Sequence, residues 1–383
     1  MRASSTSYVS WARLRPEPTD ARSCRRRSAT LRHTGSAARL RRSAAVGAVC
    51  LDPLSMSASK ETLVTRPGAA TSPLGHAPAH RWGDDLALPV GLGGNTFGRT
   101  TDADASHRIL DAFADAGGVL VDTADTYSDG ASEAILGDWM RDRNNRDQMV
   151  VSTKGGNHPA FEGLSATTVA AAAEESLRRL GTDYIDLYFA HYQDDQTPIA
   201  ETAAAFDALV RAGKIRAIGL SNFTTDAVRE WIDTAGSNGL AAPVVLQPHF
   251  SLVHRQPFEA EIAPLAREAG LAVLPYRALG GGFLSGKYRT EADTQDCARG
   301  AGVRPLLTSE GLRLLDTIDA IAREHHVRSA TIALAWLMHQ PTVTAPLASA
   351  TSGAQLEELL AAPTITLDQA EITRLNTAAD ELV

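Results

Sequence analysis

Three ionisable residues each end a short segment with the composition of a buried β-strand. They are Asp122, Lys154 and His191, and Tyr127 comes five residues after the first of them. Each residue alone has an ordinary structural interpretation, such as a helix cap, a solvated strand end or a core histidine. The carboxyl ends of parallel strands meet at one face of a barrel. The recurrence of the pattern in three successive strands therefore favours a shared functional site.

These four residue types could together form a tuned proton donor. A free tyrosine has a pKa of about 10, which is too high for efficient proton exchange near neutral pH. A nearby ammonium group, here Lys154, favours the phenolate and is expected to lower the pKa of Tyr127. A buried ammonium needs a counter-charge, which Asp122 can supply. An uncharged His191 can hydrogen-bond a substrate oxygen and orient it.

Short apolar strands alternate with helical patterns over most of the chain. Eight strands are predicted, at 86–92, 119–121, 148–153, 184–189, 215–220, 243–247, 271–275 and 342–347. The helical patterns cover 103–116, 132–142, 166–180, 199–212, 224–236, 258–269, 308–325, 329–339, 352–361 and 368–382, and Ser132 is the expected N-cap of the second. Spacing of roughly thirty residues is typical of a (β/α)8 TIM barrel. We therefore predict an α/β fold, an eight-stranded parallel barrel with extra helices before the last strand and at the C-terminus.

A doubly wound sheet would also alternate strands and helices. It would need a phosphate-binding glycine loop after the first strand. The glycines at 93, 94 and 98 do not form a GxGxxG sequence that opens a helix. This alternative is therefore weaker than the barrel.

Charge is distributed unevenly along the 383 residues. Residues 1–55 hold eleven Arg and three acidic residues, which gives this segment a net charge of +8. Because the whole chain has a net charge of −8, residues 56–383 carry a net charge of −16. We interpret 1–55 as a disordered basic tail or upstream extension, 56–82 as a linker and 83–383 as the barrel domain; a targeting or nucleic-acid-binding arm is the alternative for the tail. The acidic body argues against a nucleic-acid partner.

Cysteine spacing and hydropathy narrow the location of the protein. The sequence contains no run of about 18 apolar residues, so no membrane span is predicted. The three cysteines show neither metal-ligand nor CxxC spacing. We therefore expect a cytoplasmic protein without disulfides or a bound metal.

The chain resembles the aldo-keto reductase family over about residues 83–380. The matching segments are GLGGNTFG (91–98), VDTADTY (121–127), STKGG (152–156), DLYFAHY (186–192), GKIRAIGLSNF (213–223) and PYRALGGGFLSGKY (275–288). The resemblance maps the family's catalytic tetrad onto Asp122, Tyr127, Lys154 and His191. It implies NAD(P)H-dependent reduction of a small aldehyde or ketone to an alcohol, with Tyr127 as the proton donor.

The same resemblance implies a set of cofactor-binding residues. Ser221, Asn222 and Gln247 would hold the nicotinamide carboxamide, although Ser221 could instead cap the helix that follows it. Tyr276 would stack on the nicotinamide ring. The phosphate-binding segments would contribute Arg277, Leu279, Lys287, Ser349, Thr351 and Gln355. Many relatives carry a cation where this chain has Thr351, so NADP(H) is the first choice of cofactor and NAD(H) the second.

Several questions stay open at the level of sequence. A regulatory or sensor subunit that binds cofactor with little turnover is an alternative function, and a lyase or isomerase on a barrel is another. The intact tetrad argues against the first, and the nicotinamide-type residues argue against the second. The physiological carbonyl compound and the oligomeric state are undetermined. Candidate walls of the substrate site are Trp82, Phe97, Tyr192, His249 and Phe250.

The basic tail is expected to be dispensable for folding. It has few large apolar residues, so it cannot bury enough surface to offset the loss of chain entropy. A chain that begins at Met56 should give soluble protein and bind cofactor like the full chain. Soluble yield and a cofactor titration of both chains test this, and loss of either on truncation would show that the tail contributes to the fold.

Overall fold

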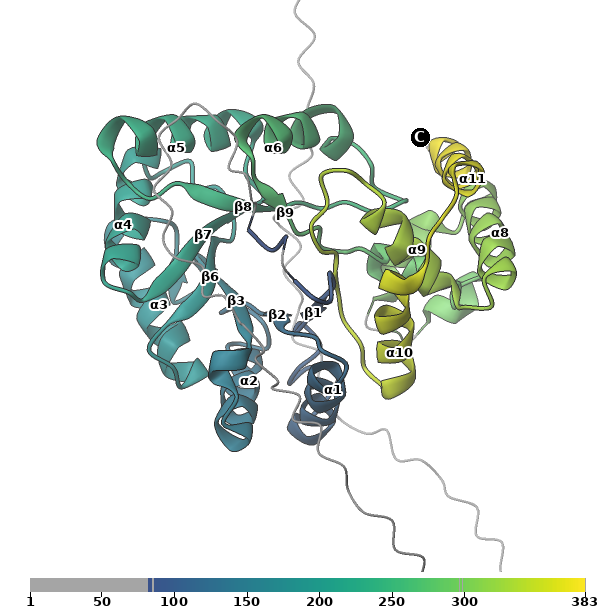
Figure 1. Cartoon of the computed structure of the whole chain (residues 1–383), viewed down its shortest axis with the longest axis horizontal. Helices are drawn as coiled ribbons and strands as arrows, with labels where there is room; N and C mark the ends of the chain where they lie inside the picture. The colour runs from purple at the N-terminus through teal and green to yellow at the C-terminus, as the bar shows by residue number, and fades with distance from the viewer. Residues whose placement is uncertain (1–81, 85, 296, 298, 383) are drawn as a thin grey trace, which may run out of the picture. The chain divides into compact units, whose positions relative to one another are not determined.

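The structure is a computed structural model that describes residues 82–84, 86–295, 297 and 299–382. The predicted tail and all of the predicted linker except Trp82 lie outside these residues. Parallel strands form one curled sheet in the order β10-β1-β2-β3-β6-β7-β8-β9 (Figure 1). Hydrogen bonds from Thr344 N to Val273 O and from Leu347 N to Pro275 O, both 2.9 Å, connect the segment at β9 with the segment that leads into β10. The eight-stranded barrel that the sequence predicts is confirmed.

Each predicted strand has a counterpart in the sheet. The strands are β1 (Gly91–Gly93), β2 (Leu120–Asp122), β3 (Val150–Gly155), β6 (Ile185–Ala190), β7 (Ile215–Ser221), β8 (Pro243–Gln247), β9 (Ala272–Val273) and β10 (Leu347–Ala348). The prediction for the first strand, 86–92, is wrong at its start, because only residues from Gly91 onward join the sheet. Pro89 lies just before it and has no N–H to donate to a neighbouring strand.

The helices follow the predicted order with small shifts at their ends. They are α1 (Ala103–Asp115), α2 (Ala131–Arg143), α3 (Ala166–Leu180), α4 (Ile199–Arg211), α5 (Thr225–Asn238), α6 (Ala263–Ala269), α7 (Gly300–Val303), α8 (Ser309–Glu324), α9 (Ser329–Met338), α10 (Gly353–Ala361) and α11 (Gln369–Asp380). The four-residue α7 and the small hairpin of β4 (Asn157–His158) and β5 (Phe161–Glu162) were not predicted. None of the helices in the described ranges is long and apolar enough to span a bilayer.

Helix α3 illustrates why the sequence forms these elements locally. The Ser165 hydroxyl accepts a hydrogen bond from Thr168 N, and Gly181 ends the helix with a φ of 62°, which glycine adopts without strain. Buried residues recur at helical spacing along one side, at Val169, Ala172, Ala173, Ser176, Leu177 and Leu180. This apolar stripe holds α3 against the sheet, so the position of its last turn is well defined.

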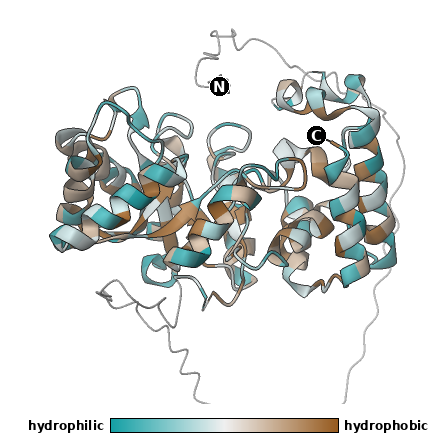
Figure 2. Cartoon of the chain, turned by 90° about the horizontal axis from the view of Figure 1, so that it is seen from above, coloured by the Kyte–Doolittle hydropathy of each residue, from teal (hydrophilic) through white to brown (hydrophobic). Residues whose placement is uncertain are grey.

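Two apolar clusters hold the barrel together. The inner cluster consists of residues in the strands or directly beside them: Leu120, Leu187, Phe189, Val245, Ala272, Leu274, Ala345 and Leu347. A larger cluster fills the space between strands and helices, so the strands are buried on both faces. Figure 2 shows the strands mostly in brown and the helices with teal as well as brown residues. Trp82 and Leu86 pack on the inner cluster together with Val150, the first residue of β3, and this places Trp82 at the amino ends of the strands.

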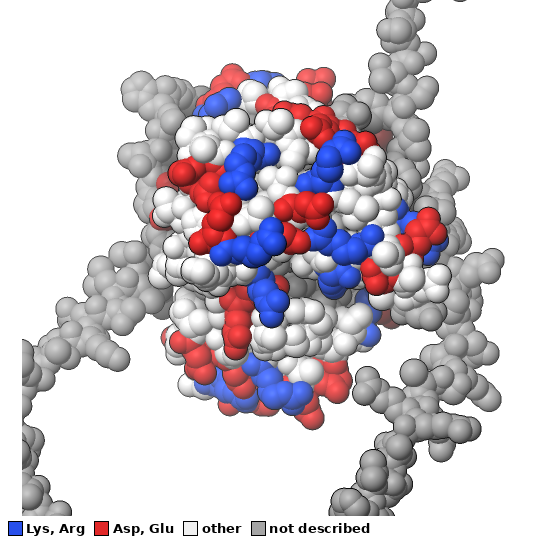
Figure 3. All heavy atoms as spheres, turned by 90° about the vertical axis from the view of Figure 1, so that its right-hand side faces the viewer, with Lys and Arg blue, Asp and Glu red and all other residues white. Residues whose placement is uncertain are grey.

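The last helices pack beside the barrel and carry mixed charges on their outer surface. Arg313 on α8 pairs with Glu381 at the end of α11 at 3.0 Å, and Arg374 on α11 pairs with Glu324 on α8 at 3.2 Å. Figure 3 shows basic and acidic side chains interspersed on the face that lies at the right of Figure 1. Exposed pairs of this kind each contribute at most about 1 kcal/mol, so the buried apolar residues carry most of the packing.

Candidate active site

The four tetrad residues lie at the carboxyl ends of three neighbouring strands. Asp122 is the last residue of β2, Lys154 the fifth of six in β3, and His191 follows β6 directly. The strand register places Asp122 opposite Ser152. Tyr127 lies in the connection between β2 and α2 and is half-buried.

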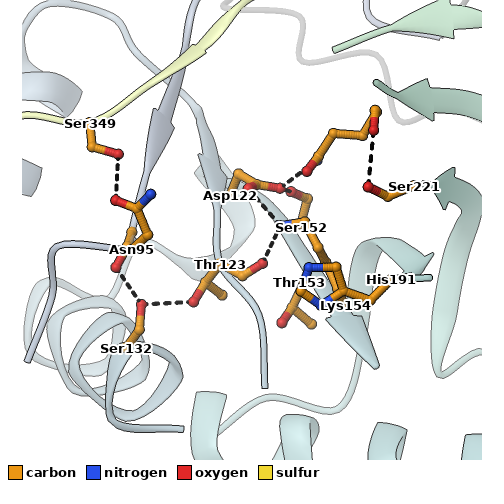
Figure 4. Close-up of polar contacts among 12 residues, drawn as sticks. Asn95, Asp122, Thr123, Ser132, Ser152, Thr153, Lys154, His191, Ser221 and Ser349 are labelled. Atoms are coloured by element: carbon orange, nitrogen blue, oxygen red, sulfur yellow. Dashed lines mark hydrogen bonds and ion pairs between the residues drawn. The ribbon is translucent and has the colours of Figure 1, made fainter. Parts of the chain in front are cut away.

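Lys154 and Asp122 form a buried, hydrogen-bonded ion pair inside the barrel (Figure 4). The ammonium donates to Asp122 Oδ2 and to the backbone oxygen of Thr123, both at 2.6 Å, and the paired side chains are 1% and 5% exposed. The other carboxylate oxygen of Asp122 accepts hydrogen bonds from Ser152 Oγ at 2.5 Å and Gln247 Nε2 at 3.0 Å. The carboxylate therefore has donors on both oxygens, which a buried charge requires.

The ion pair sets the charge that Tyr127 meets. The Lys154 ammonium lies 5.1 Å from the centre of the Tyr127 ring. Burial lowers the pKa of Lys154, but Asp122 and Tyr127 together raise it above its ordinary value, so the side chain stays charged. Burial raises the pKa of Tyr127, and the attraction of Lys154 for the phenolate offsets only part of this effect. The expected net lowering of this pKa is therefore wrong for the protein without its ligands, because burial outweighs the ammonium.

His191 is uncharged at neutral pH. Burial, together with repulsion from Lys154, lowers its pKa to about 3. Its ring lies edge-on to the ring of Tyr127 with centres 6.4 Å apart, and stacks on Tyr192, which is 46% exposed. Among the described residues, no hydrogen-bond partner is present for the buried Nδ1. A neutral imidazole in this position can hydrogen-bond a substrate oxygen and does not repel the Lys154 ammonium.

The residues assigned to the nicotinamide amide form one hydrogen-bonded chain. Ser221 Oγ donates to Gln247 O at 2.9 Å, and Asn222 Nδ2 donates to Ser221 Oγ at 3.1 Å and His191 O at 2.9 Å. The Tyr276 hydroxyl donates to Asn222 Oδ1 at 2.7 Å. The alternative role of Ser221 as a helix cap is wrong, because α5 is capped by the side chain of Thr224.

Ser132 anchors the segment that carries Tyr127. It does not cap α2 as expected, because the helix begins after Gly130, which has a φ of 83°. Instead the buried Ser132 hydroxyl donates to Gly94 O at 2.8 Å and shares a 2.7 Å hydrogen bond with Thr123 Oγ1. The hydroxyl of Ser128 donates to Phe97 O at 2.7 Å. These contacts tie the Tyr127 segment to the loop after β1.

A second polar cluster lies at the rim where β1 and β10 end. Asn95 Oδ1 accepts hydrogen bonds from Ser349 Oγ at 2.9 Å and from Arg299 Nη2 at 3.2 Å (Figure 4 shows the Ser349 contact). Partial burial, followed by repulsion from Arg99 and Arg277, lowers the pKa of Arg299. The sequence predicted Ser349 but missed Arg299, since nothing in the spacing of its neighbours marks it.

The other predicted cofactor residues lie on the loops after β9 and β10. Arg277 is exposed with a φ of 55°, and Leu279 is half-buried. Thr351 donates to Gln355 Oε1 from both its backbone N, at 2.9 Å, and its hydroxyl, at 3.0 Å. The side-chain oxygen of Gln355 therefore holds both donors of Thr351 at the first turn of α10.

Three of the predicted substrate-site walls are wrong. Phe97 and Phe250 are fully buried in the apolar core, and Trp82 packs at the opposite end of the barrel. Tyr192 stacks on His191, and His249 stacks on Tyr276 with ring centres 5.3 Å apart. These two aromatic residues lie at the same end of the barrel as the tetrad.

Comparison with known proteins gives a consistent assignment. The model of the Aldo/keto reductase family matches residues 89–380. The chain is 33% identical to the aldo-keto reductase YhdN of Bacillus subtilis, over 78% of this chain and 91% of that protein. It is 31% identical to an aryl-alcohol dehydrogenase [NADP(+)] of Phanerodontia chrysosporium (75% and 78%), and 32% identical to a probable voltage-gated potassium channel subunit beta of Oryza sativa subsp. japonica (69% and 83%).

Proposed function

Because the chain belongs to the aldo/keto reductase family, we propose that it reduces an aldehyde or ketone to an alcohol with NAD(P)H, and catalyses the reverse reaction. One observation carries the proposal. A buried, charged Lys154–Asp122 pair lies beneath the Tyr127 ring, beside an uncharged His191. A binding module would have no need of an ammonium buried at a tyrosine.

In the proposed reaction each tetrad residue has a separate task. The cofactor, when bound, supplies or accepts a hydride at the carbonyl carbon. Tyr127 donates its phenolic proton to the carbonyl oxygen in reduction, and its phenolate takes a proton from the alcohol in oxidation. Lys154 stabilises that phenolate, and Asp122 keeps Lys154 charged. His191 hydrogen-bonds the substrate oxygen and orients it toward Tyr127.

The donor set around the tetrad fits a nicotinamide dinucleotide. The hydroxyl and amide groups of Ser221, Asn222 and Gln247 can exchange hydrogen bonds with a carboxamide, and Tyr276 offers a ring for stacking. Phosphates would meet the cations Arg277, Lys287 and Arg299 together with hydroxyl groups of the loop after β10. A relative is named as NADP(+)-dependent, which supports NADP(H) as the cofactor. We also propose a cytoplasmic location, which rests only on the cysteine usage of the sequence.

A regulatory subunit with little turnover is the weaker alternative. The rice relative is named as a potassium channel β subunit, but the buried Lys154–Asp122 pair next to Tyr127 favours an enzyme. The test is to follow NADPH and NADH oxidation with a panel of carbonyl compounds. Aryl aldehydes belong in that panel first, since one relative is named as an aryl-alcohol dehydrogenase. Cofactor binding without turnover on any compound would favour the regulatory function.

Cofactor preference is expected to be modest in the wild-type protein. Thr351 carries no charge, so attraction to a 2′-phosphate is weaker than in relatives with a cation there. We expect Thr351→Arg to strengthen NADPH binding about tenfold or more and to leave NADH binding nearly unchanged, because a charge-assisted hydrogen bond contributes about 1.5–3 kcal/mol. Titration of both cofactors into both proteins measures this.

Arg299 provides the matched comparison for that measurement. If wild type already prefers NADPH by about a thousandfold, some cation other than residue 351 holds the phosphate, and the prediction for Thr351 is wrong. Arg299→Met would then identify the source. Loss of the NADPH preference in Arg299→Met would show that Arg299, which lies at the rim with Asn95 and Ser349, holds the phosphate.

A further inference from the structure

A second buried carboxyl group lies two residues before Tyr127. Asp125 is 1% exposed, and its backbone N donates to Lys154 O at 3.1 Å. Neither carboxyl oxygen has a hydrogen-bond partner of good geometry among the described residues. A buried carboxylate without donors is costly, whereas a buried neutral acid is much less so. The tetrad mechanism makes no use of this group.

The groups around Asp125 come from three other elements. Glu133 of α2 is fully buried and accepts hydrogen bonds from Thr153 Oγ1 at 2.6 Å and from Arg179 Nη1 at 3.1 Å. Arg179, in the last turn of α3, also pairs with the partly exposed Glu175 at 3.1 Å. The hydroxyl of Tyr188 on β6 is buried, and no partner for it is present among the described residues. Asp125 and Glu133 are thus two acidic groups close to Arg179, which also pairs with Glu175.

The strand register places this cluster behind the tetrad. Thr153 is paired with Tyr188, and Lys154 with Phe189, which belongs to the cluster of strand residues inside the barrel. Successive side chains of a strand point to opposite faces. Thr153 and Tyr188 therefore face the helices while Lys154 faces the interior, and Asp125 meets Lys154 from the outer side of β3.

The buried carboxyl group of Asp125, which lacks a hydrogen-bond partner among the described residues, has a raised pKa. Burial, and then repulsion from Glu133, raises the pKa of Asp125 to about 7. The backbone N–H of Thr126 and the charges of Arg179 and Lys154 oppose the shift only in part. Burial, and then the charges of Asp125 and Glu133, hold the pKa of Tyr188 well above its ordinary value, so Tyr188 stays neutral.

We propose that Asp125 is a positioning residue that modulates Tyr127 through Lys154, with its neutral form supporting the active arrangement. Ionised Asp125 adds a second negative charge that acts on Lys154 across β3, from the side opposite to its direct partner Asp122. This carboxylate weakens the stabilisation that Lys154 gives to the Tyr127 phenolate. Alcohol oxidation, which needs the phenolate as base, is therefore damped as the pH rises through the titration of Asp125. The role of Tyr127 in this scheme rests on the proposed function.

The first test does not depend on activity. Infrared difference spectra between about pH 6 and pH 8 should show a protonated carboxyl band that disappears in wild type and is absent in Asp125→Asn. Asp129→Asn is the matched control, since this carboxylate of the same loop is 91% exposed, and it should keep the band. Loss of the band only in Asp125→Asn is expected. Persistence of the band in Asp125→Asn would overturn the proposal even if the protein is a reductase.

The second test measures the effect on Tyr127. Tyrosinate absorbance, taken as the difference between each protein and the same protein carrying Tyr127→Phe, should appear at lower pH in Asp125→Asn than in wild type. The kcat/KM for alcohol oxidation should be about threefold higher in Asp125→Asn above pH 7 and similar below it, which corresponds to half a pKa unit. Identical tyrosinate titrations in the two proteins would refute the coupling. If the titrations differ but no turnover is found, only the proposed function fails.

Discussion

Replacement of Tyr127 by phenylalanine is expected to lower the rate of carbonyl reduction by at least about a hundredfold, the low end for loss of a general acid. The variant keeps the ring that lies over Lys154 and beside His191, so the packing of the site is preserved. Only the group that would pass a proton to the carbonyl oxygen is removed. Cofactor binding should therefore stay close to that of wild type.

The measurement compares initial rates on the best substrate of the panel with a cofactor titration of the same protein. Tyr184→Phe is the matched control, because it removes the same hydroxyl near the amino end of β6. The Tyr184 ring lies between the guanidinium groups of Arg146 and Arg216, at 3.9 and 3.7 Å, and the change keeps that ring. The control should retain full activity. Near-normal turnover by Tyr127→Phe would rule out the proposed proton donor.

Replacement of Asp122 by leucine is expected to reduce the free energy of unfolding by about 3–5 kcal/mol near neutral pH. The change leaves the Lys154 ammonium buried, with the Thr123 carbonyl as its one remaining hydrogen-bond acceptor among the residues that the structure describes. Lys154→Met should be less destabilising, because Asp122 keeps the hydrogen bonds from Ser152 and Gln247. The lysine variant should nevertheless lose carbonyl reduction by at least about a hundredfold, since Tyr127 loses the charge that stabilises its phenolate.

The double variant Asp122→Leu/Lys154→Met separates stability from chemistry. With neither charge present, no unpaired ion is left in the barrel, so the protein should be more stable than Asp122→Leu alone while staying inactive. Urea unfolding of the four proteins gives the comparison. A double variant no more stable than Asp122→Leu would mean that Lys154 carries no buried, uncompensated charge in that single variant.

The pH dependence of Asp122→Leu gives an independent check with a defined sign. Without its counter-charge, Lys154 should have a pKa below the unfolded value of about 10.4. The unfolded chain then binds more protons than the folded one between the two pKa values, so stability rises as the pH increases through that window. In wild type the pKa of Lys154 is raised above the unfolded value, so the pair's contribution is lost as the pH rises from the unfolded value through that raised pKa. Asp122→Leu should therefore approach wild-type stability in alkaline solution.

The barrel and the tetrad could be predicted because their signals are local. Each strand is a short apolar segment, and Asp122, Lys154 and His191 stand at or near strand ends in the sequence itself. Parallel pairing of the strands then brings these carboxyl ends together at one face of the barrel. The helices were located for the same reason, from apolar periodicity and from caps such as Ser165 and Thr224.

The errors concern contacts between distant parts of the chain. Phe97 and Phe250 follow strands of the active face, but both are turned into the core, which periodicity in a loop does not indicate. Ser132 has the composition of a cap, yet its hydroxyl bonds to Gly94, 38 residues away. Arg299 reaches Asn95 across 204 residues. The net effect on the pKa of Tyr127 likewise depends on burial, which only the folded barrel defines.

The pairing of β1 with β10 has a consequence for the order in which the protein assembles. The tetrad comes from residues 122–191, on strands that are neighbours in both sequence and space, whereas β1 pairs with β10 across more than 250 residues. Contacts of such long range form late, because the entropy of closing the chain must be met before they stabilise it. During synthesis, β2, β3 and β6 emerge well before β10. The residues for proton transfer thus become neighbours first, and the rim that holds Ser349 and Thr351 is completed only when the final strand is in place.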